Sequence, residues 1–273
     1  MNDMSLKAKI RNIASDRNIS AAAVLQNYLI GRFLFRLANS EYKDKFVVKG
    51  GMLISSIIGI DQRATMDLDT TLRNMKLEED SVKEAFIEIC AVPDEDGIEF
   101  VFNSIDPIRE DDRYGGYRIM FTAVLGKIHA PVSMDISTGD VITPEAQVHE
   151  FRDLLQPEQT IELLSYPIET VLAEKVETVL SRGVENTRPR DFYDIYMLSS
   201  SDYNAKTFKK AFIATSKHRG SYEKISDYRS IVDAIRNDGV MQQRWKGYQK
   251  QMPYAADISF DDALEVVVDL MSL

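Results

Sequence analysis

The chain has 273 residues, 44% of them hydrophobic, one cysteine, three histidines and a net charge of −10 at pH 7. This composition indicates a folded chain with enough apolar residues for one large domain or two smaller ones. The lone Cys90 excludes a disulfide framework and fits a reducing cytosol, and no histidine is spaced with a second ligand as in a zinc site. The acidic balance argues against broad nucleic-acid binding, although it leaves room for a local basic patch.

The N-terminus, MNDMSLKAKI, lacks the apolar segment of a signal peptide. No stretch approaches the ~18 consecutive apolar residues that a membrane span requires. We therefore expect a cytoplasmic protein that does not interact with membranes.

Hydrophobic periodicity in the first half predicts both helices and strands. Helices are expected over residues 4–15, 21–38, 52–58 and 78–90, and strands over 46–48, 65–72, 98–105, 117–125 and 130–136. Between residues 143 and 160, Pro144 and Pro157 favour a loop, and we place a domain boundary there. The first domain would span residues 1–155 and the second residues 156–273.

The second half is predicted to be helical almost throughout. Helices are expected over residues 167–182, 189–200, 204–218, 222–237, 239–251 and 260–272. The predicted fold class is therefore α+β (α/β): a mixed β-sheet with flanking helices, followed by an α-helical C-terminal domain. We expect that domain to close over an active-site cleft, because ligand pockets often form between domains.

The stretch Lys49–Asp69, KGGMLISSIIGIDQRATMDLD, holds the first candidate site. In a strand, residues i and i+2 share a face, so Asp67 and Asp69 project together. Two adjacent carboxylates repel, and a divalent cation relieves the repulsion; Mg²⁺ is usually held by one or two carboxylates plus substrate phosphates. Gly50 and Gly51 allow a phosphate to approach the backbone at the start of a helix. Each feature alone is common, but their order and spacing point to nucleotide chemistry.

A third carboxylate lies in the strand HAPVSMDIS, where apolar and polar residues alternate. Asp135 therefore faces away from Val132 and Met134. On this local pattern alone, a surface aspartate is the simplest interpretation.

Charged residues also fall on the apolar faces of two predicted helices. Lys175 is four residues from both Val171 and Val179, so it lies on the inward stripe of its helix. Such a lysine either extends to solvent or meets an anion. In the next helix, RPRDFYDIYML, Asp191 and Asp194 are i,i+3 neighbours on one face. Arg190 and Asp194 are i,i+4, so a surface salt bridge is the simplest interpretation.

Two of these segments together resemble the AbiEii/AbiGii toxin family of polymerase-β-like nucleotidyltransferases, the toxins of type IV toxin–antitoxin pairs. The family's first motif is KGG followed by R-x-(Ser/Thr)-x-D-(apolar)-D, and Met52 stands where that motif often has Ser or Thr. The string AEK…SR…RDFYDIY is similar to the second conserved block, so the resemblance covers roughly residues 45–200. The first motif is matched by Lys49, Gly50, Gly51, Arg63, Thr65, Asp67 and Asp69.

The resemblance implies transfer of a nucleotide from an NTP, dependent on Mg²⁺ (or Mn²⁺), with Asp67, Asp69 and Asp135 holding the metal. It implies catalytic roles for Lys175 as a phosphate-binding lysine and Asp191 as its acidic partner, with Asp194 in support. Lys49, Gly50, Gly51, Arg63, Thr65, Lys175 and Asp194 would bind the nucleotide. Some members extend tRNA 3′ ends, and a DNA-binding antitoxin is the expected partner. Transfer to a protein or a small molecule such as an antibiotic, and a non-catalytic nucleotide- or partner-binding module, stay open.

Residues 203–222 carry five cations and no acid, which is conspicuous in an acidic chain. One solvated helix face is the simpler interpretation. The functional alternative is a patch for the phosphate backbone of an RNA acceptor. The cations are Lys206, Lys209, Lys210, Lys217 and Arg219.

Overall fold

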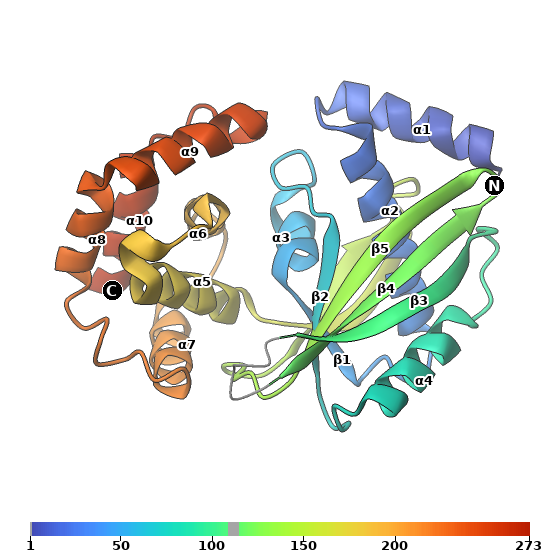
Figure 1. Cartoon of the computed structure of the whole chain (residues 1–273), viewed down its shortest axis with the longest axis horizontal. Coiled ribbons are helices and arrows are strands. Elements are labelled where there is room, and N and C mark those ends of the chain that lie inside the picture. Colours follow the sequence, from blue (N-terminus) through green and yellow to red (C-terminus); the bar gives the residue numbers. More distant parts are fainter. Residues whose placement is uncertain (1, 109–114) are drawn as a thin grey trace. The chain divides into compact units, whose positions relative to one another are not determined.

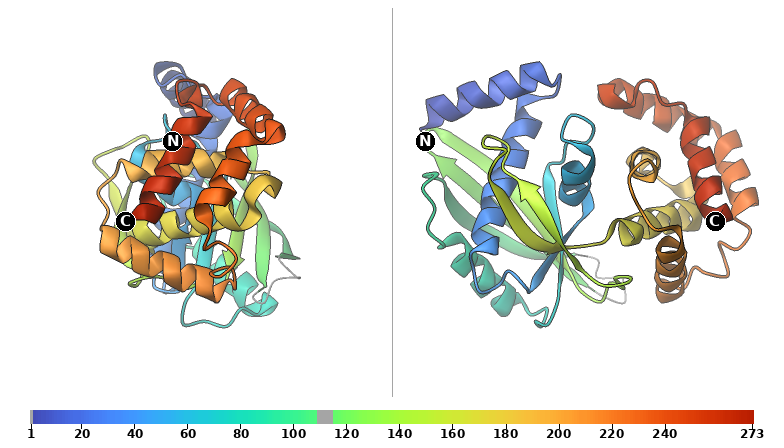
Figure 2. Two further views of the ribbon diagram at one scale, coloured as in Figure 1. Left: turned by 90° about the vertical axis from the view of Figure 1, so that its left-hand side faces the viewer. Right: turned by 180° about the vertical axis from the view of Figure 1, so that it is seen from behind.

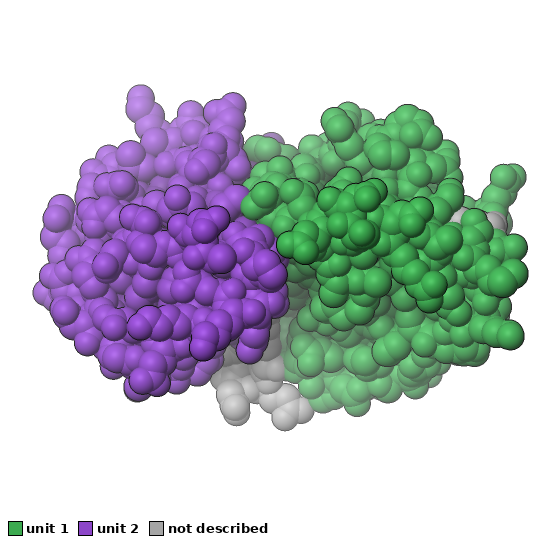
Figure 3. Space-filling view, turned by 90° about the horizontal axis from the view of Figure 1, so that it is seen from above, with its two compact units in different colours: residues 1–140, 146–166 green, residues 141–145, 167–273 purple. Residues whose placement is uncertain are grey.

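The computed structural model describes residues 2–108 and 115–273. The chain divides into two compact units, coloured separately in Figure 3. Unit 1 comprises Met1–Asp140 and Ala146–Tyr166, and unit 2 comprises Val141–Glu145 and Pro167–Leu273.

Unit 1 contains a seven-stranded mixed sheet in the order β3-β4-β5-β2-β1-β7-β6 (Figure 1). The pairs β2–β5 and β1–β7 are parallel, and the others are antiparallel. The expected mixed sheet with flanking helices is confirmed. Its elements are α1 (Asp3–Asp16), α2 (Ala21–Ala38), β1 (Phe46–Lys49), α3 (Gly50–Ile58), β2 (Asp67–Leu72), α4 (Glu79–Cys90), β3 (Glu99–Ile108), β4 (Gly116–Leu125), β5 (Ile128–Ser137), β6 (Gln147–Arg152) and β7 (Thr160–Ser165).

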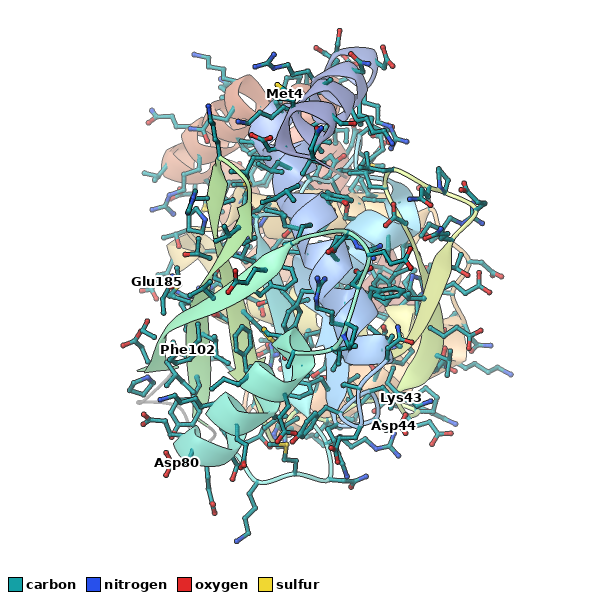
Figure 4. All side chains as sticks on the ribbon, turned by 90° about the vertical axis from the view of Figure 1, so that its right-hand side faces the viewer. Met4, Lys43, Asp44, Asp80, Phe102 and Glu185 are labelled. Carbon is teal, nitrogen blue, oxygen red and sulfur yellow. The ribbon has the colours of Figure 1, made fainter. Side chains whose placement is uncertain are left out.

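Helices α2 and α4 cover one face of this sheet; in the view from behind in Figure 2, α2 crosses the strands. Phe33 of α2 and Phe86 of α4 stack with 5.4 Å between ring centroids, and Phe121 of β4 lies 5.0 Å from Phe86. Phe102 of β3, labelled in Figure 4, lies 6.1 Å from Phe86. Because side chains alternate along a strand, Arg118, three residues before Phe121, is on the opposite face.

The loop predicted for residues 143–160 is wrong in part, because β6 lies within it and β7 begins at its end. These strands form a hairpin, and Ser165 of β7 pairs with Val48 of β1, so the hairpin extends the sheet. Directly after β6, Asp153 accepts a hydrogen bond of 2.9 Å from buried Arg32 of α2. Residues 146–166 therefore belong to unit 1, and the units divide after Tyr166, whereas the predicted boundary follows Leu155.

Unit 2 is helical, and its helices mostly follow the predicted ranges. Helix α8 was expected to begin at residue 222, but it begins at Tyr228. Asp227, just before it, caps the helix by accepting a hydrogen bond from the Ser230 amide. Within the described ranges, no helix is both long enough and apolar enough to cross a membrane. The helices are α5 (Ile168–Arg182), α6 (Pro189–Ser199), α7 (Ala205–His218), α8 (Tyr228–Asn237), α9 (Gly239–Gln251) and α10 (Phe260–Ser272).

Candidate active site

A row of five charged residues runs across the sheet of unit 1, on the face opposite the one that α2 and α4 cover. Asp106 of β3 is directly opposite Arg118 of β4, and Arg118 is opposite Asp135 of β5. Asp135 is in turn opposite Asp69 of β2, which is opposite Lys49 of β1. Directly paired residues share a face, so the row reads acid, cation, acid, acid, cation. Its centre is a pair of like charges, which is destabilising unless a cation neutralises it.

The three predicted metal ligands lie on this one face of two adjacent strands. Asp67, two residues before Asp69, accepts a hydrogen bond of 2.5 Å from the Ser133 hydroxyl. Asp135 accepts from both Nε and Nη2 of Arg118, each at 2.7 Å. This paired hydrogen bond and the negative charge of Asp135 raise the pKa of Arg118, which therefore stays charged.

Among residues 2–108 and 115–273, no three His, Cys, Asp or Glu side chains are grouped so as to hold a metal ion. Both oxygens of Asp135 are directed to Arg118. The donor set nevertheless fits a hard divalent cation, because it consists of carboxylate oxygens and contains an opposed like-charge pair. Asp67 and Asp69 would hold the ion, and Asp135 would join them after exchanging Arg118 for the metal.

The glycine pair allows the start of α3 to pack directly against these aspartates. Gly50 has φ +64°, and a Cβ placed there would lie 2.0 Å from Oδ2 of Asp69. A Cβ on Gly51 would lie 2.4 Å from Oγ1 of Thr65 and 3.4 Å from a guanidinium nitrogen of Arg63. Glycine is therefore required twice, which explains why KGG and the T-x-D-x-D segment occur together.

Arg63 and Thr65 are buried beneath the glycines, at 2% and 4% exposure. Arg63 donates to the Ala64 carbonyl at 2.5 Å, and Thr65 Oγ1 donates to the Asp67 carbonyl at 3.2 Å. Met52 is also buried. These positions favour support of the loop that leads into β2 over the direct nucleotide contact implied for Arg63 and Thr65.

Lys49 is held in a buried polar network. Its ammonium pairs with Asp140 and donates to the Ser137 hydroxyl at 2.7 Å, while Tyr166 donates to Asp140 at 2.9 Å and Thr71 also donates to Asp140. Burial favours the neutral acid, but Lys49 and the hydroxyl donors outweigh it and hold the pKa of Asp140 well below its usual range. Lys49 is thus paired with a residue that the motif does not contain, and the nucleotide contact implied for it stays a prediction.

In unit 2, the residues of the second motif form a compact ion cluster. Nζ of Lys175 in α5 lies 2.7 Å from Oδ1 of Asp191 and 2.8 Å from Oδ2 of Asp194, both in α6. Burial disfavours the ammonium, but the two carboxylates outweigh it and raise the pKa of Lys175. Lys175 thus does not extend to solvent, and the two aspartates are not on a surface. Within the described chain, the second oxygen of Asp191, Oδ2, has no hydrogen-bond partner.

The basic segment divides into two parts. Arg219 is tied to Glu174 at 2.8 Å and to Glu177 at 2.6 Å. Lys217 lies 5.2 Å from the ring centroid of Tyr222. Three lysines of α7 are exposed and form no ion pair with the residues that the structure describes: Lys206, Lys209 and Lys210.

Sequence reasoning missed Arg118, Asp106 and Asp140. Arg118 was visible as a cation in a predicted strand. The two-residue turn at Gly126 and Lys127 could have paired it with Asp135, because turn length sets the register of a hairpin. Asp140 follows β5 in a turn-like Thr-Gly-Asp segment. Its pairing with Lys49 joins residues 91 positions apart.

The fold resembles that of a protein from H. pylori described as a candidate nucleotidyltransferase, with a TM-score of 0.52, 19% identity and coverage of 93% of this chain and 95% of that chain. JHP933 from Helicobacter pylori matches with a TM-score of 0.49, 19% identity and the same coverage of each chain. No curated protein matches the sequence. The sequence profile described as "Nucleotidyl transferase AbiEii toxin, Type IV TA system" matches residues 32–266. Since this match spans most of the chain, and the fold agrees with it, the protein belongs to the AbiEii family of nucleotidyltransferase toxins.

Proposed function

We propose that this nucleotidyltransferase uses Mg²⁺ or Mn²⁺ to transfer an NMP from an NTP to an acceptor hydroxyl, with release of pyrophosphate. The supporting observation is the placement of Asp69 directly opposite Asp135, with Asp67 on the same face and the glycine pair against Asp69. A bound divalent cation would neutralise phosphate charge and activate the acceptor. Asp67 and Asp69 would hold that ion, and Asp135 would complete the set and accept the proton of the acceptor hydroxyl.

The start of α3 provides the phosphate contact in this proposal. Helix N-termini present unpaired backbone N–H groups and the positive end of the helix dipole. Gly50 and Gly51 add no side chain of their own at that end. Because the Asp69 carboxylate lies beside Gly50, phosphate oxygens would approach this backbone together with the metal ion.

Lys175 and its two aspartates form a second proposed nucleotide-binding group, which lies within unit 2. The raised pKa keeps Lys175 charged, as binding of a nucleotide phosphate requires. Asp191 and Asp194 orient the ammonium, and Oδ2 of Asp191 retains acceptor capacity for a nucleotide or acceptor hydroxyl.

The proposed acceptor is RNA, with a tRNA 3′ end as the specific candidate. The exposed Lys206, Lys209 and Lys210 of α7 support this choice, because they can contact a phosphate backbone without first breaking an ion pair. The family's type IV toxin–antitoxin description supports a cognate DNA-binding antitoxin as protein partner.

Radiolabel transfer tests the proposal. Each α-labelled NTP is incubated with the protein, Mg²⁺ or Mn²⁺ and total RNA, and label is measured separately in RNA, protein and small-molecule fractions. Asp67→Ala and Asp69→Ala should each lose transfer and weaken Mn²⁺ binding while leaving the fold intact. Asp106→Ala, at the outer end of the same charged row, is the matched control and should retain both.

Label in the protein or small-molecule fraction would reassign the acceptor. Unchanged Mn²⁺ affinity in both Asp67→Ala and Asp69→Ala would contradict the metal assignment. Nucleotide binding without transfer to any fraction would favour a non-catalytic module.

A further inference from the structure

Arg118 binds the carboxylate of Asp135, the third of the proposed metal ligands. Its guanidinium binds both oxygens of Asp135 through Nε and Nη2, at 2.7 Å each. This two-pronged geometry uses the whole carboxylate group, so Asp135 cannot contact a metal and keep this arrangement with Arg118 at the same time.

The charge row shows what this contact accomplishes. Asp69 and Asp135 are opposed like charges, flanked by Lys49 on one side and Arg118 on the other. Lys49 is directed to Asp140. Arg118 therefore neutralises Asp135 directly, which is a task that a divalent cation would also perform.

We propose that Arg118 is a positioning residue that holds Asp135 in the metal-free state, competes with the metal for this carboxylate, and turns to a nucleotide phosphate once the metal displaces it. The inference rests on the proposed metal-dependent function. A guanidinium fork binds phosphate as readily as carboxylate, so the same side chain can serve both partners. Its side chain is 50% exposed, which leaves it room to exchange them.

The alternative is an ordinary cross-strand salt bridge. An exposed salt bridge contributes little to stability, so replacing Arg118 should leave the protein folded under either interpretation. The two interpretations differ in their consequences for ligands. A structural pair predicts only the general electrostatic effect of losing one positive charge, which Arg118→Lys does not produce. Competition through the fork predicts a change in metal affinity in Arg118→Lys as well, because lysine lacks that fork.

The first test is Mn²⁺ binding without nucleotide, followed through the electron paramagnetic resonance signal of free Mn²⁺. Arg118→Gln should bind Mn²⁺ about 3–10-fold more tightly than the wild type, since a charge-assisted competitor is lost from a partly exposed site. Arg118→Lys keeps the charge but not the fork and should fall between them. Arg17→Gln is the matched control, because Arg17 is a similarly exposed cation (43%) that pairs with Asp61 elsewhere in unit 1.

The second test is calorimetric binding of a non-hydrolysable NTP at saturating Mn²⁺. Arg118→Gln should bind this nucleotide at least about fivefold more weakly, since a charged phosphate contact is lost. In the Arg118→Gln/Asp135→Asn double variant the gain in Mn²⁺ affinity should disappear, because the competition acts through Asp135.

An Arg118→Gln protein that binds Mn²⁺ no more tightly than wild type overturns this inference, and so does an equal gain in Arg17→Gln. If Mn²⁺ binding depends on Asp67 while the Arg118 variants behave as wild type, the inference fails and the proposed function stands. If wild type shows no Mn²⁺ binding that depends on Asp67, both fail.

Discussion

Replacement of Lys175 by Met tests how much the ion cluster of unit 2 contributes to the free energy of unfolding. The methionine keeps the aliphatic packing of the stem and removes the charge. In the wild type, the side chain of Lys175 is 17% exposed, that of Asp191 10% and that of Asp194 0%. The substitution therefore leaves two carboxylates buried without their cation.

Breaking a buried ion pair by removing one partner destabilises a protein by about 3–5 kcal/mol, far more than loss of an exposed pair. For a unit of this size the melting temperature should fall by on the order of 10 °C. The measurement is urea or thermal unfolding of the full chain by circular dichroism. Lys209→Met, an exposed lysine of α7, is the matched control and should unfold like the wild type.

The pH dependence provides a second check. In the wild type the raised pKa of Lys175 contributes stability that is fully present below its ordinary pKa of 10.5 and is lost as pH rises through the folded-state value.

Adding Asp191→Asn and Asp194→Asn to Lys175→Met should recover part of the lost stability, because it removes the stranded charges. A Lys175→Met protein as stable as wild type at pH 7 would refute the reasoning, since it would mean that the carboxylates are solvated.

Three further changes test other parts of the structure. Gly50→Ala should lower the free energy of unfolding in urea by at least about 1 kcal/mol and impair transfer, because φ is +64° and the added Cβ would overlap Asp69. Gly239→Ala is the control, because no atom lies within 4 Å of the Cβ that it adds. Replacing Lys206, Lys209 and Lys210 together by Gln should reduce the salt slope of RNA binding by about 2–3 units and leave NTP affinity unchanged; superimposable salt titrations would mean a solvated helix face. Asp140→Asn should reduce the loss of folding stability at acid pH. The lowered pKa of Asp140 contributes stability that is present above the ordinary value of 3.8 and is lost as pH falls through the folded-state value. An unchanged dependence of stability on pH in this range would exclude the ion pair with Lys49.

The features that the sequence alone determined are those that depend on neighbours a few residues apart. The i,i+2 spacing places Asp67 and Asp69 on one face, and helical spacing places Lys175 on the buried stripe of its helix. The motif strings were sufficient to identify the family. The β6–β7 hairpin was missed because its alternation is weak: Val148 is 64% exposed, and much of the hairpin's stabilisation comes from pairing with β1 and from Arg32.

The partners of Asp69 and Lys49 were decided only by the tertiary structure. Asp135 lies beside Asp69 because β2 and β5 pair in one particular register, and Arg118 binds Asp135 because β4 pairs with β5. Lys49 of β1 pairs with Asp140, which follows β5. A shift of one residue would turn every one of these side chains to the other face, and the register is selected by burial of the whole apolar face against α2 and α4. Long-range packing therefore determines which charges meet, although short-range spacing had already determined which charges are present.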